Sequence, residues 1–249
     1  MTDISQWMSA HHLKINPDKP ELLFLPGKDS PAHDLTINFD NSVSTPTQTA
    51  RNLGVTLYSQ LFLTATTPFR RLMLYNIRII RPLLTQKAVQ VLVQALVISR
   101  LDYCNSLLAG LPSSAIRPLQ LIQNEAARLV FNRPKFTHTT LLLCSLHWLP
   151  MAARIGFKTL VLAYHVNGSG PVYIQDMVKR YTPPRSLRSA SANQLVAPSL
   201  RAKQSSKTRL FSVLAPKWWN ELPIDIRTSE SPHIFRRKLK TYLFRLYLE

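Results

Sequence analysis

The chain has 249 residues, of which 45% are hydrophobic, so it is long enough to bury a sizeable core in one large domain or two small ones. Its 31 Lys and Arg against 13 Asp and Glu give a formal net charge of +18, which favours polyanionic partners, although basic chains also bind acidic proteins and anionic lipids. No apolar run approaches the roughly 20 residues of a membrane span and no secretory signal opens the sequence, so we expect an intracellular protein, nuclear or cytoplasmic.

The first 63 residues are expected to form a small domain that contains both helix and strand. An apolar pattern typical of one side of a helix continues to about residue 12, and Pro17 and Pro20 then prevent its continuation. Four short extended segments follow, at residues 21–25, 35–39, 42–45 and 50–57. Strands as short as these need a neighbouring sheet to be fully covered.

From residue 64 the pattern becomes helical, and we expect a helical domain over residues 64–180 and a further helical region over residues 181–249. Thr85, Ser113 or Ser114, and Ser231 are candidate N-caps, because their hydroxyl groups can accept the free backbone N–H groups of a first helical turn. The predicted helices cover residues 68–81, 85–108, 113–131 and 150–166, and a last one starts at Pro232. The predicted fold class is therefore α+β and mostly α-helical.

Basic residues are concentrated in the second half of the chain. Between Asp176 and Glu221 there is no acidic residue, and much of this stretch is rich in Ser, Pro and Ala, which is typical of an exposed loop. Such a loop suits contact with a phosphate backbone, although a basic surface that is merely solvated would show the same pattern. The candidate nucleic-acid contacts in it are Lys179, Arg180, Arg185, Arg188, Arg201, Lys203, Lys207 and Arg209.

Aromatic residues also occur in this region, as the pair Trp218 and Trp219 shows. They could contact bases, but a Trp pair followed by Leu-Pro more often anchors a helix corner to a core. We therefore predict a turn at residues 218–223 that carries two aromatic anchors.

The sequence has no grouping of residues that indicates a catalytic or metal site. Phosphoryl transfer with two metal ions requires clustered carboxylates, and the chain contains no Asp-Asp pair. His138 and His147 are too far apart for metal binding on one helix, and Cys104 and Cys144 are interpreted as core residues. We therefore assign no catalytic residue, no metal ligand and no cofactor to this chain.

Several segments resemble one protein family. The segment Trp7–Glu21 contains Trp-Met and Leu-Lys-Ile-Asn, and the segment Arg51–Leu57 reads Arg-Asn-Leu-Gly-Val-Thr-Leu. Further segments are Ser-Arg-Leu-Asp-Tyr-Cys-Asn-Ser-Leu-Leu at residues 99–108, Leu-Gln-Leu-Ile-Gln-Asn-Glu-Ala-Ala-Arg at 119–128, His-Trp-Leu-Pro at 147–150 and Trp-Trp-Asn-Glu-Leu-Pro at 218–223. Together they resemble the C-terminal part of the reverse transcriptases of non-LTR (LINE-type) retrotransposons, truncated upstream.

This resemblance implies the end of a palm in residues 1–63, a thumb in 64–180 and a basic C-terminal region in 181–249. It also implies that Lys19 flanks the active site and that Leu53, Gly54 and Val55 form the turn that grips the primer. Intact members of the family use Mg²⁺, and their catalytic carboxylates belong to parts that have no counterpart in this sequence. Pro20 and Tyr58 also depart from the family pattern, where Thr and an acidic residue are usual.

The resulting hypothesis is a remnant of an RNA-directed DNA polymerase that is inactive alone and retains some binding of RNA, DNA or hybrid duplex. The alternative is a helical protein-interaction module with no nucleic-acid function. The sequence predicts no membrane partner, and it leaves the oligomeric state open.

Overall fold

A computed structural model of the protein describes residues 2–14, 16, 21–24, 36–39, 42–58, 67–166, 170–183, 193–198 and 207–249. The chain divides into two compact units, Met1–Ala65 and Thr66–Glu249. The first division expected from the sequence, after residue 63, lies close to this boundary. The residues on either side of the second expected division, after residue 180, belong to the same unit.

The first unit consists of one helix, α1 (Thr2–Ala10), and six short strands. The strands are β1 (Leu22–Leu23), β2 (Ile37–Phe39), β3 (Ser42–Ser44), β4 (Pro46–Thr47), β5 (Thr49–Asn52) and β6 (Val55–Tyr58). They form a parallel pair, β1 with β4, and two antiparallel hairpins, β2 with β3 and β5 with β6. The Glu21 carboxylate accepts a hydrogen bond from the Arg51 backbone N–H, which ties the start of β1 to β5.

In the first unit, every side chain whose burial the structure describes is exposed or half-buried. In α1, Ile4 and Trp7 are more than half exposed, and the Trp7 ring stacks on His11 with the ring centroids 4.2 Å apart. The apolar side predicted for this helix is therefore present, with Met8 half-buried and Ile4 and Trp7 largely exposed.

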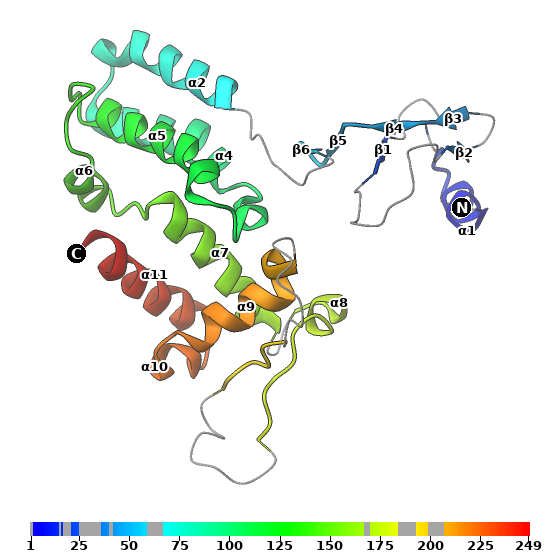
Figure 1. Cartoon of the computed structure of the whole chain (residues 1–249). Helices are drawn as coiled ribbons and strands as arrows, with labels where there is room; N and C mark the ends of the chain where they lie inside the picture. The colour runs from blue at the N-terminus through cyan, green and yellow to red at the C-terminus, as the bar shows by residue number, and fades with distance from the viewer. Residues whose placement is uncertain are drawn as a thin grey trace. The chain divides into compact units, whose positions relative to one another are not determined.

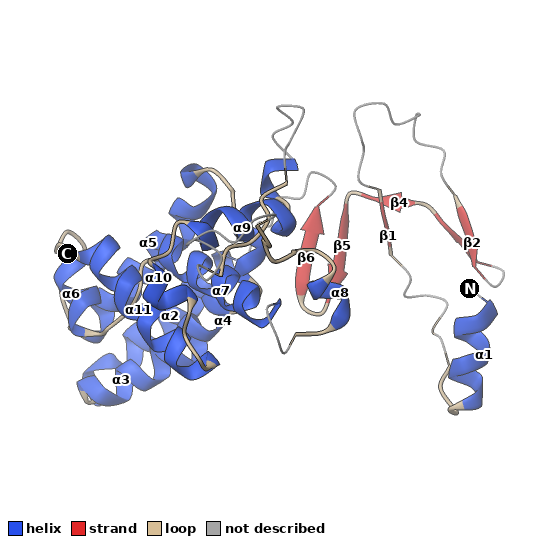
Figure 2. Ribbon diagram, turned by 90° about the horizontal axis from the view of Figure 1, so that it is seen from below, coloured by secondary structure: helices blue, strands red, loops and turns tan. Residues whose placement is uncertain are grey.

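The described residues of the second unit are mostly helical, and the protein is an α+β fold that is mostly α-helical (Figures 1 and 2). Its α-helices are α2 (Thr67–Ile80), α3 (Gln86–Val93), α4 (Ser99–Asp102), α5 (Ser113–Val130), α6 (Thr140–Ser145), α7 (Met151–Val166), α8 (Val172–Gln175), α9 (Phe211–Asn220), α10 (Ile224–Arg227) and α11 (Pro232–Leu248). Shorter turns of helix are η1 (Arg81–Leu83), η2 (Gln94–Ile98), η3 (Asn105–Leu108) and η5 (Lys207–Arg209). Among the described residues, no helix is both long enough and apolar enough to cross a membrane.

Two of the three predicted N-caps are confirmed. The Thr85 hydroxyl accepts a hydrogen bond from the Ala88 N–H at 3.2 Å, and the Ser231 hydroxyl accepts one from the Ile234 N–H at 3.3 Å. The third prediction is wrong, because α5 is preceded by Pro112 and no side chain caps its first turn.

The helix predicted over residues 85–108 ends earlier than the sequence indicated. It continues from α3 through a π-helical turn, η2, into α4, and it stops at Asp102. Cys104 then takes a left-handed conformation with φ of 53°, which an α-helix cannot accommodate, and the short helix η3 follows.

The turn predicted over residues 218–223 is shorter than expected, because residues 218–220 are the end of a helix, α9, which contains Pro216 in its interior, and the chain turns only at residues 221–222. The prediction of an aromatic anchor is confirmed, since the Trp219 side chain has no exposed surface. Its indole ring lies 5.5 Å from the ring of Phe235 in α11, and Phe235 stacks on Tyr164 of α7 at 4.5 Å. This aromatic cluster forms the centre of the core between α7, α9 and α11.

Candidate nucleic-acid interface

A pocket of about 830 Å³ lies between α2 and the C-terminal end of α5. Of the described residues that line it, six are cationic and one is acidic: Arg71, Arg78, Arg81, Arg128, Arg133 and Lys135, together with Glu125. We refer to this set as the basic pocket. Its remaining lining residues are Pro82, Leu121, Leu129, Asn132 and Pro134.

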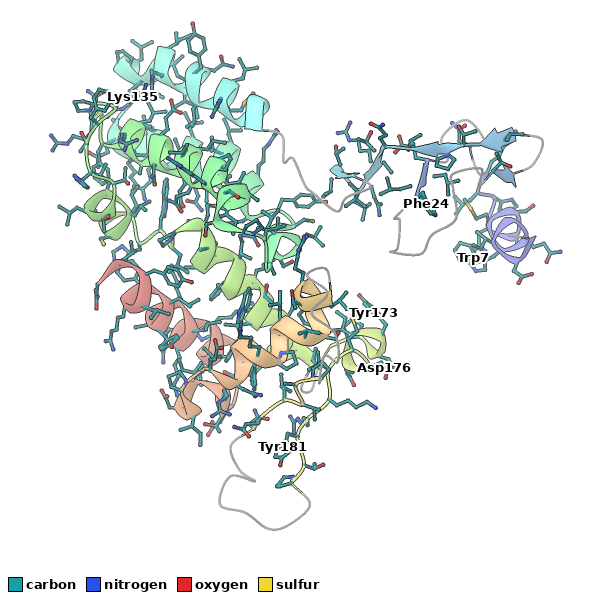
Figure 3. The ribbon with its side chains drawn as sticks, viewed as in Figure 1. Trp7, Phe24, Lys135, Tyr173, Asp176 and Tyr181 are labelled. Carbon is teal, nitrogen blue, oxygen red and sulfur yellow. The ribbon has the colours of Figure 1, made fainter. Side chains whose placement is uncertain are left out.

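The helical repeat explains why these cations converge. Arg71 and Arg78 are seven positions apart in α2, which places them on one face two turns apart. The opposite wall comes from Arg128 in the last turn of α5 and from the loop that follows. Figure 3 labels Lys135 in this loop, next to α2 and α5. Pro134 lies in the same loop, and it prevents α5 from continuing through the loop, because proline lacks a backbone N–H and disfavours helical geometry in the residue before it.

Arg78, Arg81 and Arg128 are positioned by hydrogen bonds. Arg78 Nη2 lies 3.1 Å from the Glu125 carboxylate, which forms an ion pair between α2 and α5. Arg81 donates from Nε to the Leu129 carbonyl at 3.3 Å. Arg128 donates from Nε to the carbonyl of Thr137 at 2.9 Å, which fixes the loop beyond the helix.

Arg71 and Arg133 are exposed, and we find no hydrogen bond or ion pair between either side chain and another described residue. Such guanidinium groups retain their five donors for a ligand, and their planar shape matches two oxygens of one phosphate. Six cations against one carboxylate leave an excess of positive charge in a concave site, where the field is focused on an incoming anion. The pocket is therefore suited to bind phosphate groups.

The candidate residues from the basic loop are not brought into this pocket. Lys179 and Arg180 are exposed on a short antiparallel ladder, in which the Val196 N–H donates to the Lys179 carbonyl at 2.9 Å and Arg180 pairs with Leu195. Arg209 is half-buried against Gly110, where its Cγ lies 3.0 Å from the position that a Cβ would take. Arg209 is thus partly removed from solvent.

Several sequence candidates lie outside the described residues, so their surroundings are not assigned. They are Lys19, Arg185, Arg188, Arg201 and Lys203. Lys207 begins η5, but its side chain is likewise outside the description.

Leu53 and Gly54 form the two-residue turn between β5 and β6, and Val55 begins β6. Both turn residues have positive φ, 47° for Leu53 and 78° for Gly54, as a type I′ hairpin turn requires. The Leu53 side chain is 84% exposed. The three residues of the predicted primer-grip turn are therefore adjacent at the tip of one hairpin.

Sequence reasoning did not identify the basic pocket. Its residues are spread from position 71 to position 135, and each half alone resembles an ordinary solvated helix surface. The available signal was weak: a seven-residue spacing of Arg71 and Arg78, and three cations within eight residues from Arg128 to Lys135.

The segments that carry the family resemblance make structural contacts between elements. Asp102 pairs with Arg154 at 2.7 Å, which connects α4 to α7. The side-chain amide of Gln123 in α5 donates to the Leu149 carbonyl at 2.8 Å. The Trp219 indole donates to the Asn193 carbonyl at 2.7 Å. These motif residues therefore stabilise the helical unit.

Among the described residues, no three His, Cys, Asp or Glu side chains are grouped as metal ligands would be. Four acidic residues, Asp18, Asp29, Asp34 and Asp40, lie outside that set. His147 is exposed beside Phe244, and Cys104 and Cys144 are both half-buried.

Burial lowers the pKa of the Arg227 guanidinium, whose Nε donates to the Leu222 carbonyl at 3.0 Å.

Comparison of the chain with protein-family models gives no match, and comparisons with curated proteins and with solved structures give none either.

Proposed function

We propose that this chain is a remnant of the RNA-directed DNA polymerase of a non-LTR retrotransposon and that it binds nucleic acid without polymerising it. The sequence motifs at residues 99–108, 119–128, 147–150 and 218–223 support the ancestry. The basic pocket supports the binding function. It takes the place of the loop residues 179–209 as the first candidate for the contact surface.

The observation that carries the binding function is the convergence of six cations and one carboxylate on a single pocket. A polynucleotide that places phosphates there releases condensed counterions, so its affinity falls as salt rises. Each phosphate neutralised contributes roughly 0.7 to 0.9 to the slope of log K against log salt concentration. The contribution of individual arginines to nucleic-acid binding can therefore be measured from this slope.

Fluorescence anisotropy with labelled RNA, DNA and hybrid duplex over a salt series tests this proposal. The double variant Arg71→Gln/Arg133→Gln removes two exposed charges from the basic pocket, and we expect the slope to fall in magnitude by about 1.4 to 1.8. The matched control Lys87→Gln/Arg117→Gln removes two exposed charges that do not line the pocket. The proposal would be refuted if the slope fell equally in both double variants. It would also be refuted if the native chain bound none of the probes at low salt.

Absence of polymerase activity is the second part of the proposal. It is based on the sequence, which has no Asp-Asp pair with which to chelate catalytic Mg²⁺. Primer extension on an RNA template with Mg²⁺ should give no product. Extension that survives purification to homogeneity would refute this part.

A protein-interaction module is the second candidate function, and one observation favours it. Leu72, Tyr75, Ile79 and Leu83 recur at three- and four-residue spacing along α2 and η1, and all four are more than half exposed. An apolar stripe of this kind is the surface by which a helix docks on a protein partner. Partner binding that persists after nuclease treatment and in high salt, and that Tyr75→Lys abolishes, would favour this function.

A further inference from the structure

Phe136 follows Lys135 at the edge of the basic pocket, and its side chain is 90% exposed. The Lys135 ammonium group lies 5.9 Å from the centre of the Phe136 ring. The exposed ring therefore sits beside a cationic site, with most of its surface open to a ligand.

The loop that presents the ring is held in a defined conformation. The Thr137 N–H donates to the Pro134 carbonyl at 3.1 Å, which makes Lys135 and Phe136 the two central residues of a turn. The Arg128 guanidinium holds the same turn through the Thr137 carbonyl, and the Arg133 N–H donates to the Arg128 carbonyl at 2.9 Å. A turn closed in this way projects both central side chains outward, so the ring and the ammonium group are presented together.

Base stacking is the interaction that an exposed ring beside phosphate-binding cations offers to a polynucleotide. An aromatic side chain stacks on any unpaired base, whereas in a duplex the base faces are covered by their neighbours. We propose that Phe136 is a stacking platform for an unpaired base whose phosphates occupy the basic pocket. The site then selects single-stranded nucleic acid over duplex. This inference rests on the proposed nucleic-acid binding function.

The test compares a labelled single-stranded oligonucleotide, as RNA and as DNA, with a duplex of the same sequence. Loss of one base stack weakens binding by roughly 5- to 150-fold, so Phe136→Ala should weaken single-strand binding by that factor and duplex binding by less than about twofold. Phe136→Trp should retain single-strand binding, because its ring offers a larger stacking surface. Tyr173→Ala is the matched control, since Tyr173 is an exposed aromatic in α8 that does not line the pocket.

The outcomes separate this inference from the function on which it rests. If Phe136→Ala leaves single-strand affinity unchanged while Arg71→Gln/Arg133→Gln weakens it, the stacking role is overturned and the binding function stands. Equal weakening of single-strand and duplex binding also overturns the stacking role, because the loop then acts through its general shape. If the native chain binds none of the probes, both proposals fail.

Discussion

The carboxylate of Glu125 lies 3.1 Å from Nη2 of Arg78, and this ion pair joins α5 to α2 at the wall of the basic pocket. Among the pocket-lining residues that the structure describes, Glu125 is the only acidic one. Both side chains are well exposed, so the pair contributes less than about 1 kcal/mol to stability after solvent screening. Glu125 therefore affects the charge of the site more than the stability of the fold.

Glu125→Gln should strengthen nucleic-acid binding. Removing one negative charge from a phosphate site is worth roughly 0.5 to 1 kcal/mol in water, which corresponds to a two- to fivefold gain in affinity at low salt. The gain should shrink as salt screens the site. Anisotropy titrations measure it, with Glu230→Gln as the control at an exposed acid outside the pocket. Weaker binding by Glu125→Gln would indicate that the ion pair, rather than the charge, matters.

Arg81→Met should destabilise the helical unit. The Arg81 guanidinium donates to the carbonyls of Leu129, Leu84 and Val130 at 3.0–3.4 Å, and Leu129 and Val130 belong to the C-terminal end of α5. We expect the free energy of unfolding to fall by about 1–3 kcal/mol in urea titrations. Arg71→Met removes an exposed arginine from the same pocket and should change stability by less than about 0.5 kcal/mol. Equal destabilisation by Arg81→Met and Arg71→Met would show that the hydrogen bonds of Arg81 to these carbonyls contribute nothing to stability.

Asn220→Asp should weaken the attachment of Leu195 to α9. The Asn220 side chain accepts a hydrogen bond from the Leu195 N–H and donates one to the Leu195 carbonyl, both at 2.9 Å. Aspartate retains the acceptor but replaces the donor with an oxygen that repels the carbonyl, at a cost of about 1–3 kcal/mol. Hydrogen exchange of the Leu195 amide should become faster, whereas an unchanged rate would mean that this contact does not hold the segment.

Leu53→Asn should stabilise the β5–β6 hairpin. Leucine at φ of 47° is strained by about 1–2 kcal/mol, whereas Asn before Gly suits a type I′ turn. The amides of β5 and β6 should gain roughly fivefold or more in protection from hydrogen exchange. Unchanged or lower protection would show that Leu53 makes compensating contacts.

Periodic patterns and local caps identified much of the helical unit. The helices expected over residues 113–131 and 150–166 and the hydroxyl caps of Thr85 and Ser231 depend on residues that are close in sequence, so the sequence alone reveals them. The interruption at Cys104 and the helix α9 depend on tertiary packing, since Pro216 in α9 argues locally against a helix. The basic pocket depends on the packing of α2 against α5, and no local pattern encodes that geometry.

Photochemical crosslinking followed by mass spectrometry locates the contact surface most directly. The full chain is bound to a single-stranded oligonucleotide that carries a photoreactive base, and the crosslinked peptides are sequenced. We expect crosslinks within residues 71–81 and 128–137, with Phe136 among them. Crosslinks confined to residues 179–209 would contradict binding at the basic pocket and would return the binding surface to the basic loop.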